Sequence, residues 1–187
     1  SGYVNLTEYL SEKSSLPFWY DQTNRRIGRL ASHSMGLLSR FEPTEIVEHR
    51  LPGRIPGRGA LFIRYGSKQD SLVVLILHMA LGKRARLRQF DYISEIVNEY
   101  RHVIVMGDLN CPSQSPEMDY LINRTLMSEP FHDMHTFPSW RPQRNIDHIL
   151  VTPTLTVEYV KVLNYSLSDH LPVEMQITLP DEIRLGS

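Results

Sequence analysis

An apolar stretch that runs into two polar side chains constrains this chain more than any other part of its sequence. Residues 103–106 are Val, Ile, Val and Met, and they lead directly into Gly107, Asp108 and Asn110. Four such residues in succession predict a strand in a sheet that is covered on both faces. Gly107 lets the backbone turn, and Asp108 and Asn110, two positions apart, project the same way from extended backbone. The stretch predicts either a catalytic strand end or an Asx-type turn in which both side chains bond only their own backbone.

Length and composition are those of one globular domain. The chain has 187 residues, 41% of them hydrophobic and 22% charged, so a single domain over 1–187 can bury a core. Its formal net charge of -1 gives no global positive field to attract nucleic acid. An anionic substrate must therefore be held locally. The basic residues favour this, since 16 of the 20 are arginines, whose planar guanidinium suits phosphate oxygens.

The cysteine count and the hydrophobic runs bear on the compartment. Cys111 is the only cysteine, so an internal disulfide is excluded and a reducing compartment, with the cytoplasm favoured, is expected. We interpret its side chain as a small buried hydrophobe, with a reactive nucleophile as the alternative. No apolar run approaches the roughly 20 residues that a membrane-spanning helix requires, so no transmembrane segment is expected.

Hydrophobic patterning in the first half of the chain predicts one short helix followed by strands. Apolar residues from Tyr3 to Leu10 recur at helical spacing, which predicts an amphipathic helix ending near Ser14. The aromatic residues at 18–20 are interpreted as core, and the polar run at 21–26 as a loop with a face for phosphate or nucleic acid. Strands are expected at 36–40, 45–51, 60–65 and 71–78, with a proline- and glycine-rich loop at 52–59.

In the second half, helices join the strands. Apolar residues follow the helical period from 85 to 100, and the arginines at the start of this helix oppose its dipole, which indicates an anionic group nearby, protein or substrate. Ser115 and Pro116 predict the start of a short helix that ends near Leu121. A loop at 136–144 and strands at 147–152, 157–163 and 173–178 follow. This order predicts an α/β (α+β) layered sandwich with largely antiparallel strands.

Four polar clusters at the expected strand ends resemble the motifs of one family. They are His78, Asp108 with Asn110, Asp147 with His148, and Asp169 with His170. In order and context they are similar to the endonuclease/exonuclease/phosphatase superfamily, the fold of DNase I. Residues 36–40 resemble "G-x-x-x-S-R", 107–110 match "G-D-F/L-N", 146–149 match "I-D-Y/H-I", and 168–173 match "S-D-H-x-P-V".

The resemblance implies a fold and a reaction. The fold is a sandwich of two mostly antiparallel β-sheets flanked by helices. The reaction is hydrolysis of a phosphodiester or phosphomonoester with Mg²⁺, or Mn²⁺ in its place, by a nuclease or by a small-molecule or lipid phosphodiesterase. Within that resemblance, Asp147 holds His170, which contacts the scissile phosphate or handles its proton. Asp108 aligns or deprotonates the attacking water, and whether Asp108 or His170 is the base stays open.

Further roles follow from the same resemblance. Asn110 orients Asp108 and the phosphate, His78 binds a non-bridging oxygen, and Asp169 joins Asp108 at the metal. His148 is interpreted as a packing residue. Loops on the site side carry further candidates for binding phosphates, including those of nucleic acid, and these are Arg54, Arg58, Arg141 and Arg144. Trp140 in the same region either stacks on a base or caps the core.

The chain departs from the family pattern before Gly36. In the family, one strand supplies an Asn and a second supplies a metal-binding Glu, and neither motif stands here. We therefore expect a domain that is truncated at its N-terminus, binds Mg²⁺ weakly and shows little hydrolysis by itself. An exposed sheet edge would also favour self-association. The competing hypothesis is a non-catalytic binding or scaffold protein that retains the fold without the metal site.

Overall fold

The computed structural model describes residues 5–27, 31–53, 58–130 and 134–185, with the backbone alone described for 22–27 and 31–34. In chain order the elements are α1 (Leu6–Lys13), β1 (Phe18–Ile27), β2 (Ala31–Ser39), β3 (Glu45–Arg50), β4 (Gly59–Gly66), β5 (Ser71–His78), α2 (Lys83–Val97), β6 (His102–Asp108), α3 (Pro116–Thr125), β7 (Asp147–Val151), β8 (Thr156–Val162) and β9 (Val173–Thr178).

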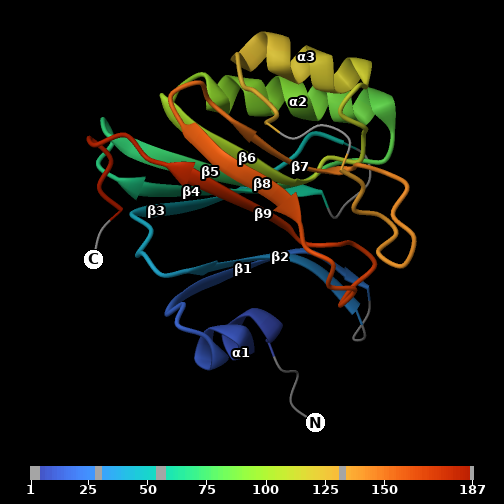
Figure 1. The fold of residues 1–187 in the computed structure, drawn as a ribbon, viewed down its shortest axis with the longest axis horizontal. Coiled ribbons are helices and arrows are strands. Elements are labelled where there is room, and N and C mark those ends of the chain that lie inside the picture. Colours follow the sequence, from blue (N-terminus) through green and yellow to red (C-terminus); the bar gives the residue numbers. More distant parts are fainter. Residues whose placement is uncertain (1–4, 28–30, 54–57, 131–133, 186–187) are drawn as a thin grey trace.

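The elements form layers around one central sheet (Figure 1). This sheet has the order β3–β4–β5–β6–β7, and its neighbours are antiparallel except for the parallel pair β5 and β6. Helices α2 and α3 lie on one face, and the β1–β2 and β8–β9 sheets lie on the other. The predicted layered sandwich with flanking helices is confirmed. Its second strand layer consists of two separate two-stranded sheets.

The central strands are buried on both faces, as their continuous apolar runs predict. Along β5, Val73, Leu75 and Leu77 belong to the core beneath α2 and α3. The alternate residues Leu72 and Val74 belong to the core shared with β1–β2 and β8–β9. Because successive side chains of a strand point to opposite faces, only an uninterrupted apolar run fills both cores.

The helices that cover the central sheet begin near the predicted positions. The Ser115 hydroxyl accepts a hydrogen bond from the Met118 amide at 3.2 Å and caps α3, with Pro116 in its first turn. This helix continues to Thr125, beyond the predicted end, because Leu121 and Ile122 extend its apolar contact with the core. None of the helices in the described ranges is long and apolar enough to cross a membrane.

Two predictions near the N-terminus need correction or restriction. Residues 21–26, expected as a loop, belong to β1, because β1 pairs antiparallel with β2 through this run, with an irregularity between Thr23 and Arg25. Cross-strand pairing outweighs the polar composition of this run. The predicted first helix is confirmed as α1, although Tyr3 lies outside the described residues. It packs close to β2, since a Cβ added at Gly36 would lie 2.7 Å from the Thr7 hydroxyl oxygen.

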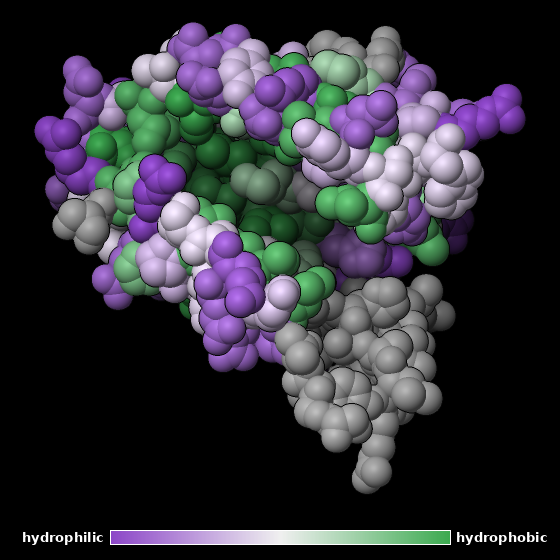
Figure 2. All heavy atoms as spheres, turned by 60° about the horizontal axis from the view of Figure 1, so that its bottom comes forward, coloured by the Kyte–Doolittle hydropathy of each residue, from purple (hydrophilic) through white to green (hydrophobic). Residues whose placement is uncertain are grey.

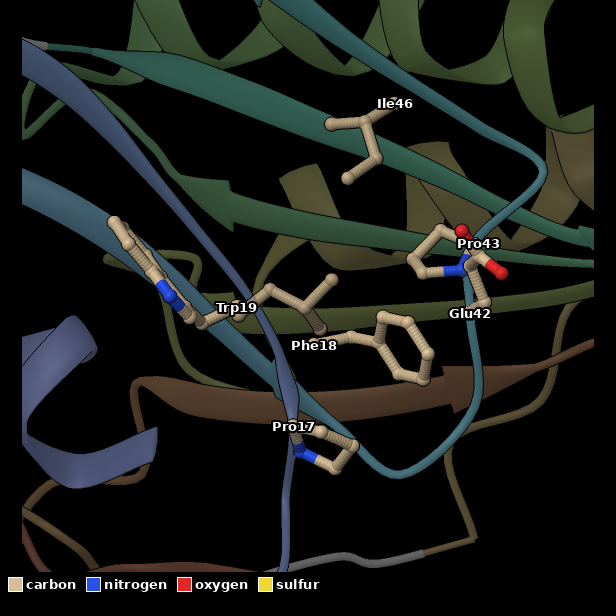
Figure 3. A pocket seen from close by; sticks show the side chains of 7 residues that line it. Pro17, Phe18, Trp19, Glu42, Pro43 and Ile46 are labelled. Atoms are coloured by element: carbon tan, nitrogen blue, oxygen red, sulfur yellow. The ribbon is translucent and has the colours of Figure 1, made fainter. Parts of the chain in front are cut away.

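The strand layer leaves part of the central sheet incompletely covered. Ile76, Met106 and Ile149 are neighbours across β5, β6 and β7, and all three side chains are only half-buried. Figure 2 shows a hollow of hydrophobic residues on the face that lies at the bottom of Figure 1. A pocket of about 290 Å³ also opens where β1 and β2 approach β3, with Phe18, Trp19 and Pro43 among its walls (Figure 3).

Candidate active site

Three polar side chains stand in one row across adjacent strands of the central sheet. His78 ends β5, Asp108 ends β6 and Asp147 begins β7. The strand register pairs His78 with Asp108 and Asp108 with Asp147. Ile76 lies two positions before His78 on β5, and Met106 lies two positions before Asp108 on β6. Side chains two positions apart on a strand point to the same face, so the row lies on the sheet face opposite α2 and α3. Strand ends at matched register thus bring together residues far apart in the sequence.

A tight turn fixes Asp108. Its Oδ1 accepts a hydrogen bond from the Asn110 amide at 2.9 Å, and its Oδ2 accepts one from Asn110 Nδ2 at 3.1 Å. Gly107 has a φ of 131°, and a Cβ there would lie 2.1 Å from the Leu77 carbonyl oxygen, so only glycine fits. The Asx-type turn is therefore present. The same carboxylate also faces His78, whose Nε2 lies 3.6 Å from Asp108 Oδ2.

The environment of Asp108 favours its protonated form. Burial raises the pKa of its carboxyl group, and the nearby Asp147 carboxylate raises it further. The hydrogen bond from the Asn110 amide and the charges of His170 and Arg58 act in the opposite direction without cancelling the shift. A raised pKa makes the ionised carboxylate a stronger proton acceptor, which suits a general base.

His170 reaches this row from the loop between β8 and β9. Its Nδ1 lies 2.7 Å from Asp147 Oδ2, so the predicted contact is present. The Thr136 hydroxyl donates to the same carboxylate oxygen, and the Phe137 ring lies 4.8 Å from the imidazole ring, centroid to centroid. The Leu171 amide donates to the Thr136 carbonyl at 2.9 Å, which holds the two loops together. Asp147 and Thr136 thus orient His170 over the row.

A guanidinium group flanks the other end of the row. Arg58 Nη1 contacts His78 Nε2, and because an arginine N–H only donates, the imidazole nitrogen accepts. Asn110 Nδ2 donates to the Met79 carbonyl at 3.0 Å, which fixes the chain just after His78. Burial lowers the pKa of Arg58, an effect that the charge of Asp108 opposes. Arg58 places positive charge where an anionic group could approach.

Other predicted site residues lie at the periphery. The Asp169 side chain is exposed and has no hydrogen bond to another described residue, while its carbonyl accepts from the Ser139 amide at 2.8 Å. Trp140 is 74% exposed. Arg141 and Arg144 are exposed, and the Arg144 guanidinium lies 5.7 Å from the centre of the Phe137 ring. Arg54 lies outside the described residues.

A buried polar cluster behind the row was not expected from the sequence. His148, interpreted as a packing residue, is buried, but its Nδ1 also pairs with Glu129 Oε1 at 2.5 Å and its Nε2 with the Cys111 carbonyl at 2.7 Å. The Cys111 side chain is buried, and burial is the main cause that raises its pKa to about 11. Cys111 is therefore a packed thiol and not a nucleophile. Thr136, Phe137 and Glu129 have no motif that marks them in the sequence.

Comparisons with known proteins identify the family and the fold. A family model described as Endonuclease/Exonuclease/phosphatase family matches residues 4–170. A search of curated protein sequences finds no match. Among solved structures, an endonuclease/exonuclease/phosphatase family protein from Bacteroides thetaiotaomicron is 20% identical, with a TM-score of 0.76 over 93% of this chain and 79% of that chain.

Two further solved structures have the same fold. A mannosyl-6-phosphatase of Bacteroides thetaiotaomicron VPI-5482 is 19% identical, with a TM-score of 0.73 over 92% of this chain and 81% of that chain. The human Nocturnin catalytic domain, in a structure with a bound sulfate anion, is 16% identical, with a TM-score of 0.73 over 94% of this chain and 76% of that chain. The matched family model covers the row and His170, and the chain belongs to the endonuclease/exonuclease/phosphatase family.

Proposed function

We propose that the row formed by His78, Asp108 and Asp147 is a site for the hydrolysis of a phosphate ester. The observation that carries the proposal is the register of β5, β6 and β7, which sets two carboxylates and an imidazole side by side at one end of the sheet. A second imidazole, that of His170, is held against the row by Asp147. Membership of a generally hydrolytic family supports the same conclusion.

Binding of the phosphate group is assigned to the donors around the row. Attack on phosphorus increases negative charge on the equatorial oxygens, so positioned N–H groups and positive charges stabilise the transition state. Arg58 supplies such groups beside His78. His78 Nε2 accepts from Arg58, and the two Nδ2 hydrogens of Asn110 bond Met79 and Asp108, so direct contacts of His78 and Asn110 with a phosphate require these bonds to exchange. Inward movement of Arg144 would add a further guanidinium. These groups would contact the phosphate of any phosphate ester, so other residues must determine which ester is bound.

Proton transfer is assigned to Asp108. Its raised pKa fits a carboxylate that takes a proton from the attacking water, which converts the water to a stronger nucleophile. Asp147 accepts from the Nδ1–H of His170, so the Nε2 of the same ring points away from Asp147 and is free to contact the scissile phosphate or the leaving oxygen. Asp147 and Thr136 are positioning residues for that ring.

The residues described do not by themselves fit the expected metal ion. Mg²⁺ requires near-octahedral oxygen ligation. Within the described ranges, no group of three or more His, Cys, Asp or Glu side chains is arranged to hold a metal. Both oxygens of Asp108 already accept hydrogen bonds from Asn110, and Asp169 is exposed. The family generally uses divalent ions, and Mg²⁺ or Mn²⁺ at Asp108 and Asp169 stays a prediction.

That missing ligand set favours a second candidate function, a binding or scaffold protein that recognises phosphate groups without hydrolysing them. The two candidates differ in one measurable property, turnover.

Self-association through an exposed edge also stays a prediction, and sedimentation velocity over a range of protein concentrations measures it.

The test is a turnover assay on phosphate esters of different classes. Bis(p-nitrophenyl) phosphate, p-nitrophenyl phosphate, a hexose 6-phosphate and an abasic-site oligonucleotide are incubated with the chain, with Mg²⁺, Mn²⁺ or EDTA. For any ester that is cleaved, Asp108→Asn should lower kcat at least about a hundredfold, the usual scale for a general base. Asp181→Asn, an exposed and distant matched control, should leave kcat unchanged. Equal turnover by both variants would remove Asp108 from the mechanism, and no turnover of any ester would favour the binding protein.

A further inference from the structure

A second concave site lies on the opposite side of the central sheet, between the edge strand β3 and helix α2. Its volume is about 350 Å³. Glu45, Val47 and His49 of β3 line it, whereas Ile46 between them lines the pocket of Figure 3 on the other face. The site is therefore separated from the catalytic row by the sheet itself. We call it the aromatic pocket.

Four rings form the walls that give this pocket its name. His49 lies 5.8 Å from Tyr92 and 6.2 Å from Phe62 between ring centroids, with interplanar angles of 60° and 64°. Phe62 lies 5.4 Å from Tyr100 at 51°. Tilted and edge-to-face rings at these distances pack against one another, and together they line the pocket. His49 Nδ1 and the Tyr92 hydroxyl share a 2.7 Å hydrogen bond that fixes two of the walls, and burial lowers the pKa of His49, which disfavours the charged form of this ring.

The rim of the aromatic pocket is negatively charged. Glu45, Glu95 and Glu99 line it, and all three side chains are exposed. Arg64 Nε bonds Glu45 at 2.9 Å, but among the described residues neither Glu95 nor Glu99 has an ion-pair partner. Burial raises the pKa of Tyr100, and the carboxylates of Glu99 and Glu45 raise it further, as expected where the local potential is negative. Aromatic faces with nearby carboxylates are the surroundings that an organic cation prefers.

The position of β3 indicates how such a cation would arrive. Within the described ranges, β3 pairs with β4 alone in the central sheet, so no described strand pairs with its outer edge. An extended peptide that pairs with this edge places every second side chain on the face that carries Glu45, Val47 and His49. The aliphatic stem of a lysine would then pack on Val47 while its ammonium group meets the rings and the carboxylates.

We propose that the aromatic pocket and the edge of β3 bind an extended basic peptide segment, with one lysine side chain in the pocket. The acidic rim and the open edge favour this partner over an acidic peptide or an apolar ligand. This interaction goes beyond the proposed hydrolysis and does not depend on it, because the pocket shares no residue with the catalytic row.

Isothermal titration of a seven-residue peptide tests the proposal. The probe is an acetylated and amidated peptide with threonine at both ends and alternating valine and lysine between them; its control has glutamate in place of lysine. The lysine peptide should bind, and more weakly as salt is added, whereas the glutamate peptide should not. The double variant E95Q/E99Q and the variant Tyr92→Leu should each weaken binding roughly tenfold, as loss of exposed charge pairs or of an aromatic face implies.

Matched controls separate the pocket from general electrostatics and from catalysis. Glu12→Gln removes an exposed carboxylate on α1, and Tyr159→Leu removes an exposed ring on β8; both should bind the peptide as the unaltered chain does. Asp108→Asn should also bind normally, whatever its turnover. Hydrogen exchange of residues 45–50 should slow when the peptide is bound. The proposal would be overturned if the two peptides bind equally, or if the control variants weaken binding as much as the pocket variants do. Binding of tetramethylammonium without binding of the lysine peptide would also overturn it.

Discussion

Replacing Glu117 with glutamine removes the negative charge from a buried ion pair while keeping the shape of the side chain. Arg86 is 7% exposed and Glu117 is 4% exposed, and Arg86 Nη2 lies 2.7 Å from Glu117 Oε1. The other terminal nitrogen, Nη1, donates to the carbonyl oxygens of Ala80 and Leu81 at 3.0 and 2.6 Å. The pair therefore joins α2 and α3 and also holds the chain that follows His78. The anion expected beside the arginines of α2 is thus a protein group, Glu117.

The size of the effect follows from burial. Removing one partner of a buried pair destabilises a protein by about 3–5 kcal/mol, because the remaining charge lacks compensation. Arg86 keeps its two carbonyl acceptors and a glutamine oxygen, so we expect the lower end, about 3 kcal/mol. With a urea m value of about 2 kcal/mol/M, the unfolding midpoint should fall by roughly 1.5 M. Lys83→Gln is the control, since Lys83 Nζ lies 3.5 Å from Glu117 Oε2 with an exposed side chain, and should cost under about 1 kcal/mol.

The effect should depend on pH with a definite sign. Burial alone would raise the pKa of Glu117, but the hydrogen bond from Arg86 and the charge of Lys83 outweigh it, so the folded-state pKa is lowered. The stabilisation by the ionised carboxylate is therefore full above the unfolded-state pKa and is lost as pH falls through the folded-state pKa. Urea unfolding at several pH values should show the gap between Glu117→Gln and the unaltered chain narrowing in acid. A gap under about 1 kcal/mol at pH 7, or one independent of pH, would refute the reasoning.

Three further predictions concern the site. Asp108→Asn should raise the unfolding free energy at neutral pH, measured in urea. The pKa of Asp108 is raised in the folded chain, which means that its ionised form disfavours folding. A lower unfolding free energy in the variant would show instead that the hydrogen bonds from Asn110 dominate. Cys111 should not react with a thiol reagent at pH 8 until the chain unfolds, since its pKa is about 11 and it is buried; fast labelling of the folded chain would contradict this. Calorimetric titration should give a Mg²⁺ dissociation constant of about 1 mM or weaker, because no three-ligand group is present in the described ranges; micromolar affinity would contradict this expectation.

The sequence allowed the strands of the site to be predicted because their pattern is local. The apolar run of β5 and the Gly107-Asp108-Leu109-Asn110 turn each limit the backbone to few conformations. Their ends therefore identified His78 and Asp108 before the register was known, whereas Asp147 was identified from the family motif at 146–149. The contact between His170 and Asp147 was predicted from the family motifs alone, since the two residues lie on separate elements.

The features that escaped prediction depend on tertiary pairing. The polar half of β1 has no apolar alternation and is a strand only because β2 pairs with it. Thr136 and Phe137 lie in a loop whose path is set by hydrogen bonds to Leu171 and Asp169 in another loop. His148 and Glu129 lie on opposite sides of a long loop. A histidine and a glutamate 19 residues apart carry no sequence signal that they pair.

The central claim, that His78, Asn110 and His170 surround one phosphate-binding position, is tested most directly by nuclear magnetic resonance. Inorganic phosphate is titrated into the chain while the ring signals of both histidines and the side-chain amide of Asn110 are followed. The three should shift together with one dissociation constant, which His170→Ala should weaken, while the exposed ring of His135 stays unchanged. Shifts that differ in midpoint, or that are no larger than the shift of His135, would contradict the account.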